Sequence, residues 1–405
     1  MVDFLLGLVL LATSPLWGLW LLSKSHRRAH WIERLRRLQT GSFDLWVHGA
    51  SVGEILALET LLTGLRRERP TLRILVTVNT LAGRAAAKAK YPYCAVQLAP
   101  LDWGPILRRF MKGLNPKLHI LSELDIWPSR QRELSRRGIP TLVAGARMSA
   151  KGFQRTRWAW FLMGPAYGHV QHWACRDEAT KDRLAQLGIE PTRLAVSGSL
   201  KFDALLGPLK PVPEAARLVG DRPWVVAGSL HPGEEGPFIE LAKRGVCRVL
   251  LAPRHLHRLD QFEMAIRSAG VEHERWTSWR NEGVPLVLMD EMGVLAHLYS
   301  KASVAFVGGS LVPVGGHNML EPARFGVPVV VGPHTHHFEE EMAALRLREG
   351  VMETSLEKAA RDIQGLLSSR NRCESMGRQA RSGLEGLAGG STRVHTQVMA
   401  MLEPG

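Results

Sequence analysis

The chain has 405 residues, of which 45% are hydrophobic and 22% are charged, so long disordered segments are excluded and two domains of roughly 180 residues are expected. The formal net charge of +14 indicates an acidic partner, which nucleic acid, an anionic membrane or an acidic substrate can supply. No helix-turn-helix pattern, zinc-finger spacing or aromatic RNA-binding strand is present, so no nucleic-acid partner is predicted.

The first element is an uncharged segment from Phe4 to Leu22, followed by a basic cluster at residues 24–28. As a helix it would extend about 28 Å, close to the hydrocarbon thickness of a bilayer. The charges follow the apolar run, and no small-residue cleavage site ends it, so a retained anchor fits better than a signal peptide. The positive-inside rule then predicts an inner-membrane protein whose catalytic domains face the cytoplasm. A helix lying in the membrane interface is the alternative, favoured by Pro15 and two tryptophans.

Beyond this segment, short apolar runs alternate with stretches that have a helical pattern of apolar positions. Such runs are typical of parallel strands covered on both faces, so we expect an α/β fold. Helical patterns occupy Ile55–Arg67 and Leu259–Ala269. The expected strands are Asp44–Gly49, Arg73–Val78, Leu118–Leu121, Pro140–Ala144 and Leu194–Ser197 in the first half, and Trp224–Ala227, Arg248–Ala252, Pro285–Leu288, Val304–Val307 and Pro328–Val331 in the second.

The two halves are separated by residues 205–222, which contain three prolines and no convincing strand and therefore predict a linker. The predicted organisation is a membrane anchor (1–24), a Rossmann-like domain (25–204), this linker and a second Rossmann-like domain (223–405). We expect the domains to face each other across a cleft, where ligands meet the carboxyl ends of strands.

Two acidic motifs follow strands of the first half. H-G-A-S-V-G-E at residues 48–54 leaves a strand and enters a helix, where glycines and fresh backbone amides can approach a ligand. Glu54 would face the cleft there, although a first-turn acid is also a common partner of the helix dipole. E-L-D-I-W-P at residues 123–128 places Glu123 and Asp125 at another strand end, with capping again the alternative.

The second half carries a candidate phosphate cradle. A-G-S-L-H-P-G-E-E at residues 227–235 contributes Ser229, His231 and local amides, and it lacks the G-K-[ST] ending of a P-loop. Arg254, after the next expected strand, can pair with a phosphate or remain a solvated surface charge.

The most informative motif contains two glycine pairs, at residues 308–309 and 315–316, around a loop that enters a helix. Its backbone amides can hold a phosphate, and Glu321, one turn into the helix, can accept both hydroxyls of a ribose. A single glycine pair would be an ordinary turn, but two pairs beside Asn318 and Glu321 favour a binding site.

The sequence predicts chemistry without a metal or a cofactor. No D-x-D pair of carboxylates occurs, although transferases that hold a nucleotide-sugar through a metal usually need one. The four cysteines form no C-x-x-C pair, which also fits a reducing compartment. His334, His336 and His337 are close together, but such a run is more often a polar loop than a ligand set.

Together these residues resemble the family of Kdo (3-deoxy-D-manno-oct-2-ulosonic acid) transferases, which adopt the GT-B fold. The resemblance extends from the N-terminus to about Glu340, and it implies that the helices from Leu345 onward pack back on the first domain. Besides the motifs above, it is carried in order by A-R-M-S (146–149), G-S-L-K-F-D (198–203), P-R-H (253–255), M-G-x-L (292–295) and G-G-H-N-x-L-E-P (315–322).

The resemblance implies metal-independent, inverting transfer of Kdo from CMP-Kdo to a hydroxyl of a lipid A precursor (lipid IVA), a step of inner-core lipopolysaccharide synthesis. Catalysis would fall to Glu54 as general base and Glu123 as a second acid. The implied donor-binding residues are Ser229, His231, Arg254, Gly316, Asn318 and Glu321, and the acceptor-binding candidates are Ser51, Gly53, Arg147 and Lys201.

Departures from the family pattern at three positions, in two motifs, concern the acceptor side. Asp125 and Ser129 stand where the family usually has Glu and Asn, and Gly145 stands where Asn is usual. Two other functions stay open: a sugar-nucleotide 2-epimerase of the same fold, which would not need the anchor, and an inactive relative that only binds lipid A precursors, which would not need the two glutamates.

Overall fold

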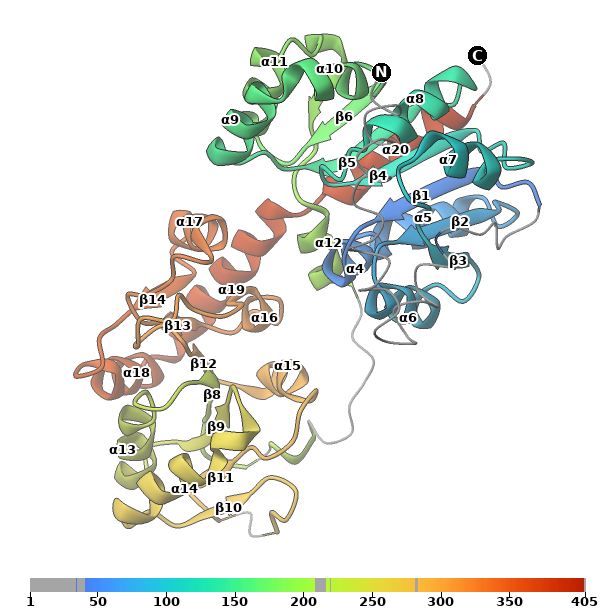
Figure 1. The fold of residues 1–405 in the computed structure, drawn as a ribbon. Coiled ribbons are helices and arrows are strands. Elements are labelled where there is room, and N and C mark those ends of the chain that lie inside the picture. The colour runs from blue at the N-terminus through green and yellow to red at the C-terminus, as the bar shows by residue number, and fades with distance from the viewer. Residues whose placement is uncertain (1–33, 35–40, 208–215, 219, 281–282, 404–405) are drawn as a thin grey trace, which may run out of the picture. The chain divides into compact units, whose positions relative to one another are not determined.

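A computed structural model describes residues 34, 41–207, 216–218, 220–280 and 283–403 (Figure 1). The chain divides into two compact units, one of residues up to 204 together with 388 onward, and one of residues 205–387. The predicted anchor at residues 4–22 lies outside the described residues. Among the helices that are described, none is long and apolar enough to cross a membrane.

The first unit is built on a seven-stranded parallel sheet of order β3-β2-β1-β4-β5-β6-β7. Hydrophobic clusters on both faces show that helices cover the sheet on two sides. Its strands are β1 (Leu45–Gly49), β2 (Ile74–Val78), β3 (Ala95–Leu98), β4 (Leu118–Ser122), β5 (Thr141–Ala146), β6 (His172–Cys175) and β7 (Leu194–Val196). Its helices are α4 (Val52–Ala57), α5 (Glu59–Glu68), α6 (Leu81–Lys90), α7 (Gly104–Phe110), α8 (Pro128–Arg136), α9 (Ala150–Trp158), α10 (Trp160–Gly168), α11 (Glu178–Gln186), α12 (Leu200–Leu206) and α20 (Gly390–Leu402).

The second unit has its own seven-stranded parallel sheet, of order β10-β11-β9-β8-β12-β13-β14. Its strands are β8 (Trp224–Leu230), β9 (Arg248–Pro253), β10 (His273–Arg275), β11 (Leu286–Leu288), β12 (Val304–Val307), β13 (Val329–Val331) and β14 (Val351–Glu353). Its helices are α13 (Gly236–Arg244), α14 (Leu259–Ser268), α15 (Leu295–Leu298), α16 (Leu320–Ala323), α17 (Glu339–Leu347), α18 (Ala359–Leu367) and α19 (Arg370–Leu387).

Each sheet reverses its order at one place, between β1 and β4 in the first unit and between β8 and β12 in the second. Ligands of such sheets bind outside the carboxyl ends of the strands at this switch point. The acidic motifs follow β1 and β4, and the glycine-rich motifs follow β8 and β12. All four motifs therefore lie where the topology predicts a ligand.

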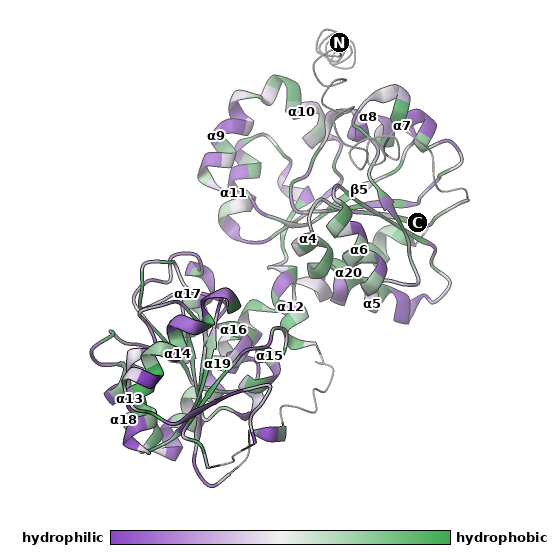
Figure 2. Cartoon of the chain, turned by 60° about the horizontal axis from the view of Figure 1, so that its bottom comes forward, coloured by the Kyte–Doolittle hydropathy of each residue, from purple (hydrophilic) through white to green (hydrophobic). Residues whose placement is uncertain are grey.

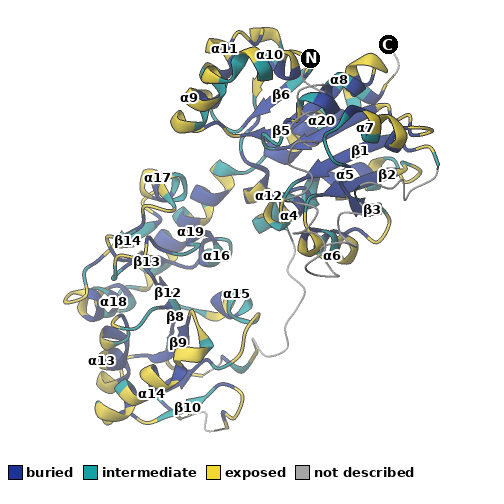
Figure 3. Cartoon of the chain, viewed as in Figure 1, coloured by how far each residue is buried: buried dark blue, intermediate teal, exposed yellow. Residues whose placement is uncertain are grey.

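All ten expected strands are present, with ends shifted by up to three residues. The four strands that were not expected are β3, β6, β10 and β14, of which three are sheet edges. Edge strands are covered less completely (Figure 3), so they lack the continuous apolar run that marks the others. The expected helix Ile55–Arg67 is two helices, α4 and α5, that meet at Leu58.

The predicted extent of the second domain is corrected at its end, because residues 388–405 belong to the first unit. In α20, Val394, Val398 and Leu402 are buried in the core of the first sheet. Asp203, the last residue of G-S-L-K-F-D, accepts hydrogen bonds from the backbone N–H groups of Gly389 (2.6 Å) and Ser391 (2.7 Å) and so holds the start of this helix.

The predicted linker is also corrected in part. Leu205 and Leu206 end α12, and Leu218 is buried in the core of the second unit. Residues 208–215 and 219 lie outside the described residues.

Candidate active site

The first switch point presents the carboxylate of Glu54. Ser51 is the N-cap of α4, and its Oγ accepts the N–H of Glu54 at 3.3 Å. In return, Glu54 accepts hydrogen bonds from Ser51 Oγ (2.9 Å) and from the N–H of Ala50 (2.8 Å). This is close to a capping box, so the capping interpretation is correct, and the same bonds fix where the carboxylate points.

Glu54 is half-buried, and its pKa is raised. Burial is the largest cause, and the negative charges of Glu123 and Asp125 act in the same direction, against the hydrogen bonds from Ala50 and Ser51. A carboxylate with a raised pKa is a stronger base than an ordinary one.

Glu123 follows β4 in a left-handed backbone conformation, with φ of 55°. Such a conformation is uncommon for a residue other than glycine and is often found at functional sites. The Glu123 Oε1 atom lies 3.5 Å from Lys201 Nζ, so the structure brings together two of the predicted site residues in one ion pair.

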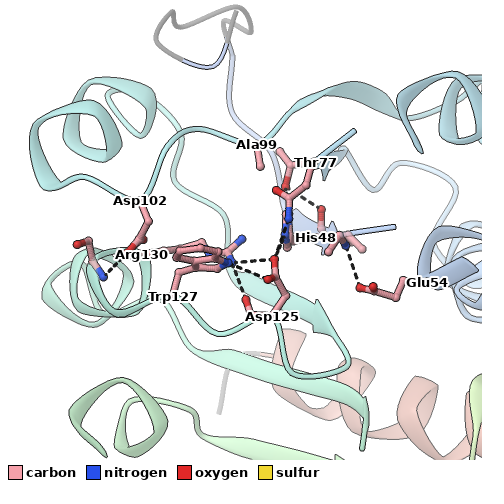
Figure 4. A network of polar contacts seen from close by, with 12 residues as sticks. His48, Glu54, Thr77, Ala99, Asp102, Asp125, Trp127 and Arg130 are labelled. Carbon is pink, nitrogen blue, oxygen red and sulfur yellow. Dashed lines mark hydrogen bonds and ion pairs between the residues drawn. The ribbon is translucent and has the colours of Figure 1, made fainter. Parts of the chain in front are cut away.

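Asp125 is the centre of a polar network that sequence reasoning did not predict (Figure 4). Its Oδ2 contacts His48 Nε2 (2.8 Å) and accepts from Asn79 Nδ2 (3.1 Å), and its Oδ1 accepts from Trp127 Nε1 (2.8 Å). The network ties the carboxyl end of β1 to the loops after β2 and β4. Burial acts to raise the pKa of Asp125, but His48, Arg130 and Trp127 together lower it well below its usual value.

His48 is fully buried, and burial, followed by the charge of Arg130, lowers its pKa to about 4. The ring is therefore neutral near pH 7. The hydroxyl of Thr77 accepts from Trp46 Nε1 (2.8 Å), and its own proton can go to His48 Nδ1 at 2.9 Å or to the carbonyl of Val47 at 3.4 Å, of which the shorter bond is the one to His48. We assign the remaining ring proton to Nε2, where it donates to Asp125.

A cavity of about 310 Å³ lies beside this network. Arg130 is buried and donates from Nη2 to the carbonyl of Asp125 (2.7 Å), and Asp102 accepts the N–H groups of Ser129 (2.9 Å) and Arg130 (2.7 Å) at the start of α8. The cavity is lined by Asn79, Asp102, Trp127 and Arg130, by Arg34, and by the apolar residues Ala99, Pro100, Leu101 and Leu107.

The remaining predicted acceptor residues differ in their surroundings. Arg147 is exposed after β5. Gly53 lies in the first turn of α4, and an added Cβ would be 3.9 Å from the nearest atom, Ser51 Oγ, so the fold itself leaves room for a side chain. Gly145 has φ of +69° at an irregularity between β5 and β6, a conformation that Asn also tolerates.

The second switch point is held together by Glu234, a fully buried carboxylate in the loop after β8. It accepts four backbone N–H groups, those of His231 (2.8 Å), Gly309 (2.7 Å), Ser310 (3.0 Å) and Leu311 (2.8 Å). The prediction that the local amides of the glycine-rich loops after β8 and β12 bind a phosphate is therefore wrong for these four groups. The motif contained Glu234, but nothing in the sequence indicated its partners.

The glycines of the loop after β12 are required by close packing. A Cβ on Gly308 would lie 2.5 Å from the carbonyl oxygen of Ser229, and one on Gly315 would lie 2.4 Å from His337 Nδ1. Gly316 has φ of +85°, and its N–H is bonded to the carbonyl of Gly309 at 2.8 Å. The Gly316 amide is thus also unavailable to a phosphate.

Polar side chains gather above these loops. Ser229 has a left-handed backbone, with φ of 56°, at an irregularity in β8. His231 Nε2 lies 3.0 Å from His317 Nε2, and the two rings are stacked. Burial, followed by the charge of Arg254, lowers the pKa of His317 to about 4. Arg254 itself is exposed and has no ion pair with a described acid.

Asn318 and Glu321 lie together, as predicted. Asn318 Nδ2 donates to Glu321 Oε1 at 3.4 Å, and Asn318 Oδ1 accepts the N–H of Leu320 at 3.2 Å. Burial raises the pKa of Glu321, against the hydrogen bond from Asn318 and the charges of Arg254 and Arg324. Within the described part of the chain, no group of three His, Cys, Asp or Glu side chains is arranged to hold a metal ion.

Comparison with known proteins identifies the family. The family model described as 3-deoxy-D-manno-octulosonic-acid transferase (kdotransferase) matches residues 28–204. A 3-deoxy-D-manno-octulosonic acid transferase of Haemophilus influenzae is 32% identical over 82% of this chain and 81% of its own. That of Chlamydia pneumoniae is 34% identical over 72% of this chain and 69% of its own.

Among solved structures, UDP-GlcNAc 2-epimerase from Neisseria meningitidis, bound to UDP-GlcNAc, matches 88% of this chain and 99% of its own, with a TM-score of 0.60 and 14% identity. At this identity the likeness shows a shared fold of the GT-B type, and it says nothing about activity. The much higher identity to the transferases decides the family: the chain belongs to the Kdo transferases.

Proposed function

We propose that the protein is an inverting transferase that moves Kdo from CMP-Kdo to a hydroxyl of a lipid A precursor. The observation that carries the proposal is Glu54, a half-exposed carboxylate with a raised pKa, oriented by two hydrogen bonds at the switch point of the first sheet. A base of this kind is what activation of a sugar hydroxyl requires.

In the proposed step, Glu54 takes the proton of the acceptor hydroxyl while the hydroxyl oxygen forms a bond to the anomeric carbon of Kdo. The bond between that carbon and the phosphate oxygen breaks, and CMP leaves with the electron pair. General-base action of this kind contributes about two to four powers of ten in rate. Attack from the side opposite CMP inverts the anomeric centre.

We assign CMP to the second unit. Glu321, with its carboxylate positioned by Asn318, is suited to accept the ribose hydroxyls. Arg254 can meet the phosphate, because its guanidinium has no ion pair with a described acid. Ser229 and His231 remain candidates through their side chains, since the nearby amides are already bonded to Glu234.

We assign the acceptor to the first unit. The cavity beside Asp125 combines apolar walls with the guanidinium of Arg130, a combination that suits a phosphorylated sugar lipid. Lys201, Arg147, Ser51 and Gly53 lie on the segments around Glu54 and Glu123. We further propose that the reaction needs no metal or cofactor, that it occurs at the cytoplasmic face of the inner membrane, and that it serves inner-core lipopolysaccharide synthesis.

The test is an assay of the purified full chain with CMP-Kdo and a tetra-acylated lipid A precursor, with and without EDTA. The proposal predicts equal formation of CMP and Kdo-bearing lipid in both. Loss of product with EDTA would contradict metal independence alone. No product from a folded protein that binds CMP would contradict the acceptor assignment, and no binding of CMP would contradict the donor assignment.

A further inference from the structure

The surface formed by α9 and α10 exposes large aromatic side chains. Trp158 is 85% exposed and Phe161 is 80% exposed. Together with Leu347 in the second unit, they are the most exposed large hydrophobic side chains among the described residues. Trp160, between them, instead packs against Tyr167 with ring centroids 5.6 Å apart. Packing within the protein therefore does not explain the two exposed rings.

The two helices form one continuous face. The N–H of Ala159 bonds to the carbonyl of Arg155, and the carbonyl of Ala159 accepts from Leu162 and Met163, so helical bonding is maintained across the junction. Residues three or four positions apart then lie on the same side. Exposed positions follow this spacing at Lys151, Gln154, Arg155, Trp158, Phe161 and Pro165, and the exposed Arg157 lies four positions before Phe161. Much of α9 is exposed (Figure 3).

The same face is strongly basic. Residues 147–169 contain four Lys and Arg residues and no Asp or Glu, a charge of +4 with His neutral. Neither Lys151 nor Arg155 forms an ion pair with a described acid, and Arg157 lies over the ring of Phe153 at 6.0 Å. Hydropathy changes along the face, from the polar α9 to the more apolar α10 (Figure 2).

We propose that this aromatic–basic face, defined as Lys151, Arg155, Arg157, Trp158 and Phe161, docks on an anionic phospholipid bilayer. Exposed Trp and Phe beside Lys and Arg that lack a described acidic partner are the combination that the interfacial layer of such a bilayer accommodates, with rings at the headgroup level and cations beside the phosphates. The inference rests on the proposed function in one respect, that the acceptor is a membrane lipid. Docking by α9 and α10 would hold the first unit at the surface where that lipid resides.

The test uses an environment-sensitive fluorophore on the full chain in which Cys94 and Cys373 are changed to Ala. One variant carries Trp158→Cys, and the matched control carries Leu347→Cys, at a position that is 81% exposed in the second unit. Each labelled protein is reconstituted into vesicles of phosphatidylcholine, with or without phosphatidylglycerol. The measurement needs no turnover, so its failure is distinguishable from failure of the transferase proposal.

We expect the emission maximum of the label at residue 158 to move to shorter wavelength in vesicles that contain phosphatidylglycerol. The emission of the label at residue 347 should not change. The emission shift at residue 158 should become smaller when three charges of the face are removed together, by Lys151→Gln, Arg155→Gln and Arg157→Gln. It should not change when three exposed charges of the second unit are removed instead, by Arg361→Gln, Arg372→Gln and Arg378→Gln. Emission from the label at residue 158 that is unchanged in both kinds of vesicle would overturn the proposal. A shift of equal size in vesicles with and without phosphatidylglycerol would overturn its anionic-lipid part. A shift that appears without vesicles as the protein concentration is raised would overturn the proposal in favour of contact between copies of the chain.

Discussion

The two switch points are built by opposite means. In the first unit, loops are joined through side chains, with Asp125 bonded to His48, Asn79 and Trp127. In the second unit, they are joined through the main chain, with one carboxylate, Glu234, bonded to four backbone N–H groups and with glycines that leave no space for a Cβ. The first site should therefore tolerate changes that keep polar contacts, and the second should tolerate almost none.

The largest effect is expected from Glu234→Ala. Two buried and two half-buried N–H groups would lose their acceptor, and because each buried loss costs about 1–3 kcal/mol, we expect the second unit to lose at least about 3 kcal/mol of stability together with its CMP affinity. Hydrogen exchange of Gly309, Ser310 and Leu311 would measure this. Glu235→Ala is the control, since that carboxylate accepts one amide, from Gly233 at 2.7 Å. Equal effects of the two variants would contradict the comparison.

The first unit should respond to acid through His48. Its folded pKa of about 4 lies below the ordinary value of 6.5, so the unfolded chain takes up the proton first. Stability is then full above pH 6.5, falls as the pH is lowered from 6.5 to 4, and loses about 3 kcal/mol before levelling off. Urea unfolding across this range, followed by hydrogen exchange in β1, should show a weaker dependence for His48→Gln. The exposed His257→Gln should behave as wild type.

A smaller effect, on the acceptor alone, is expected for Gly53→Ala. The fold leaves room for the methyl group, and Ala in a helix is favoured by about 0.5–1 kcal/mol, so the protein should be slightly more stable. If the acceptor approaches the backbone here, the same methyl group should weaken acceptor binding by about 1–3 kcal/mol. Steady-state kinetics would show a raised acceptor KM. Gly365→Ala, with open space around it in α18, should gain stability without a kinetic change.

The smallest effect is expected for Gly145→Asn, which restores the residue usual in the family. Asn tolerates the left-handed conformation, and the nearest atom to an added Cβ is the flexible Cδ1 of Leu200, at 2.8 Å. We expect a change in stability within about 0.5 kcal/mol. Gly145→Val, by contrast, should lose about 1–3 kcal/mol in thermal unfolding. A large loss with Asn would show that this departure is not conformationally neutral.

The difference between the two switch points also explains which features the sequence could predict. Buried parallel strands and the motifs at their ends are local patterns, so β1, β4, β8 and β12 and the positions of Glu54 and Glu321 followed from them. Edge strands such as β10 lack that pattern. Contacts between distant segments are not local: Asp125 meets His48 across 77 positions, and Glu234 meets Gly309 across 75.

The place of α20 shows the same limit. Its apolar spacing indicates an amphipathic helix, but which core buries that face is decided by Asp203, almost 190 positions earlier. The family resemblance implied this packing for all helices from Leu345 onward, and that prediction is wrong for α18 and α19, which belong to the second unit; it holds for α20 alone.

The central claim is that the first unit supplies the general base, Glu54, and that the second unit binds the donor. Calorimetric titration of CMP into Glu54→Gln, beside a transfer assay of the same protein, tests it most directly. We predict CMP affinity equal to wild type, with turnover reduced by about 10²–10⁴. Weakened CMP binding, or turnover near the wild-type rate, would contradict the claim.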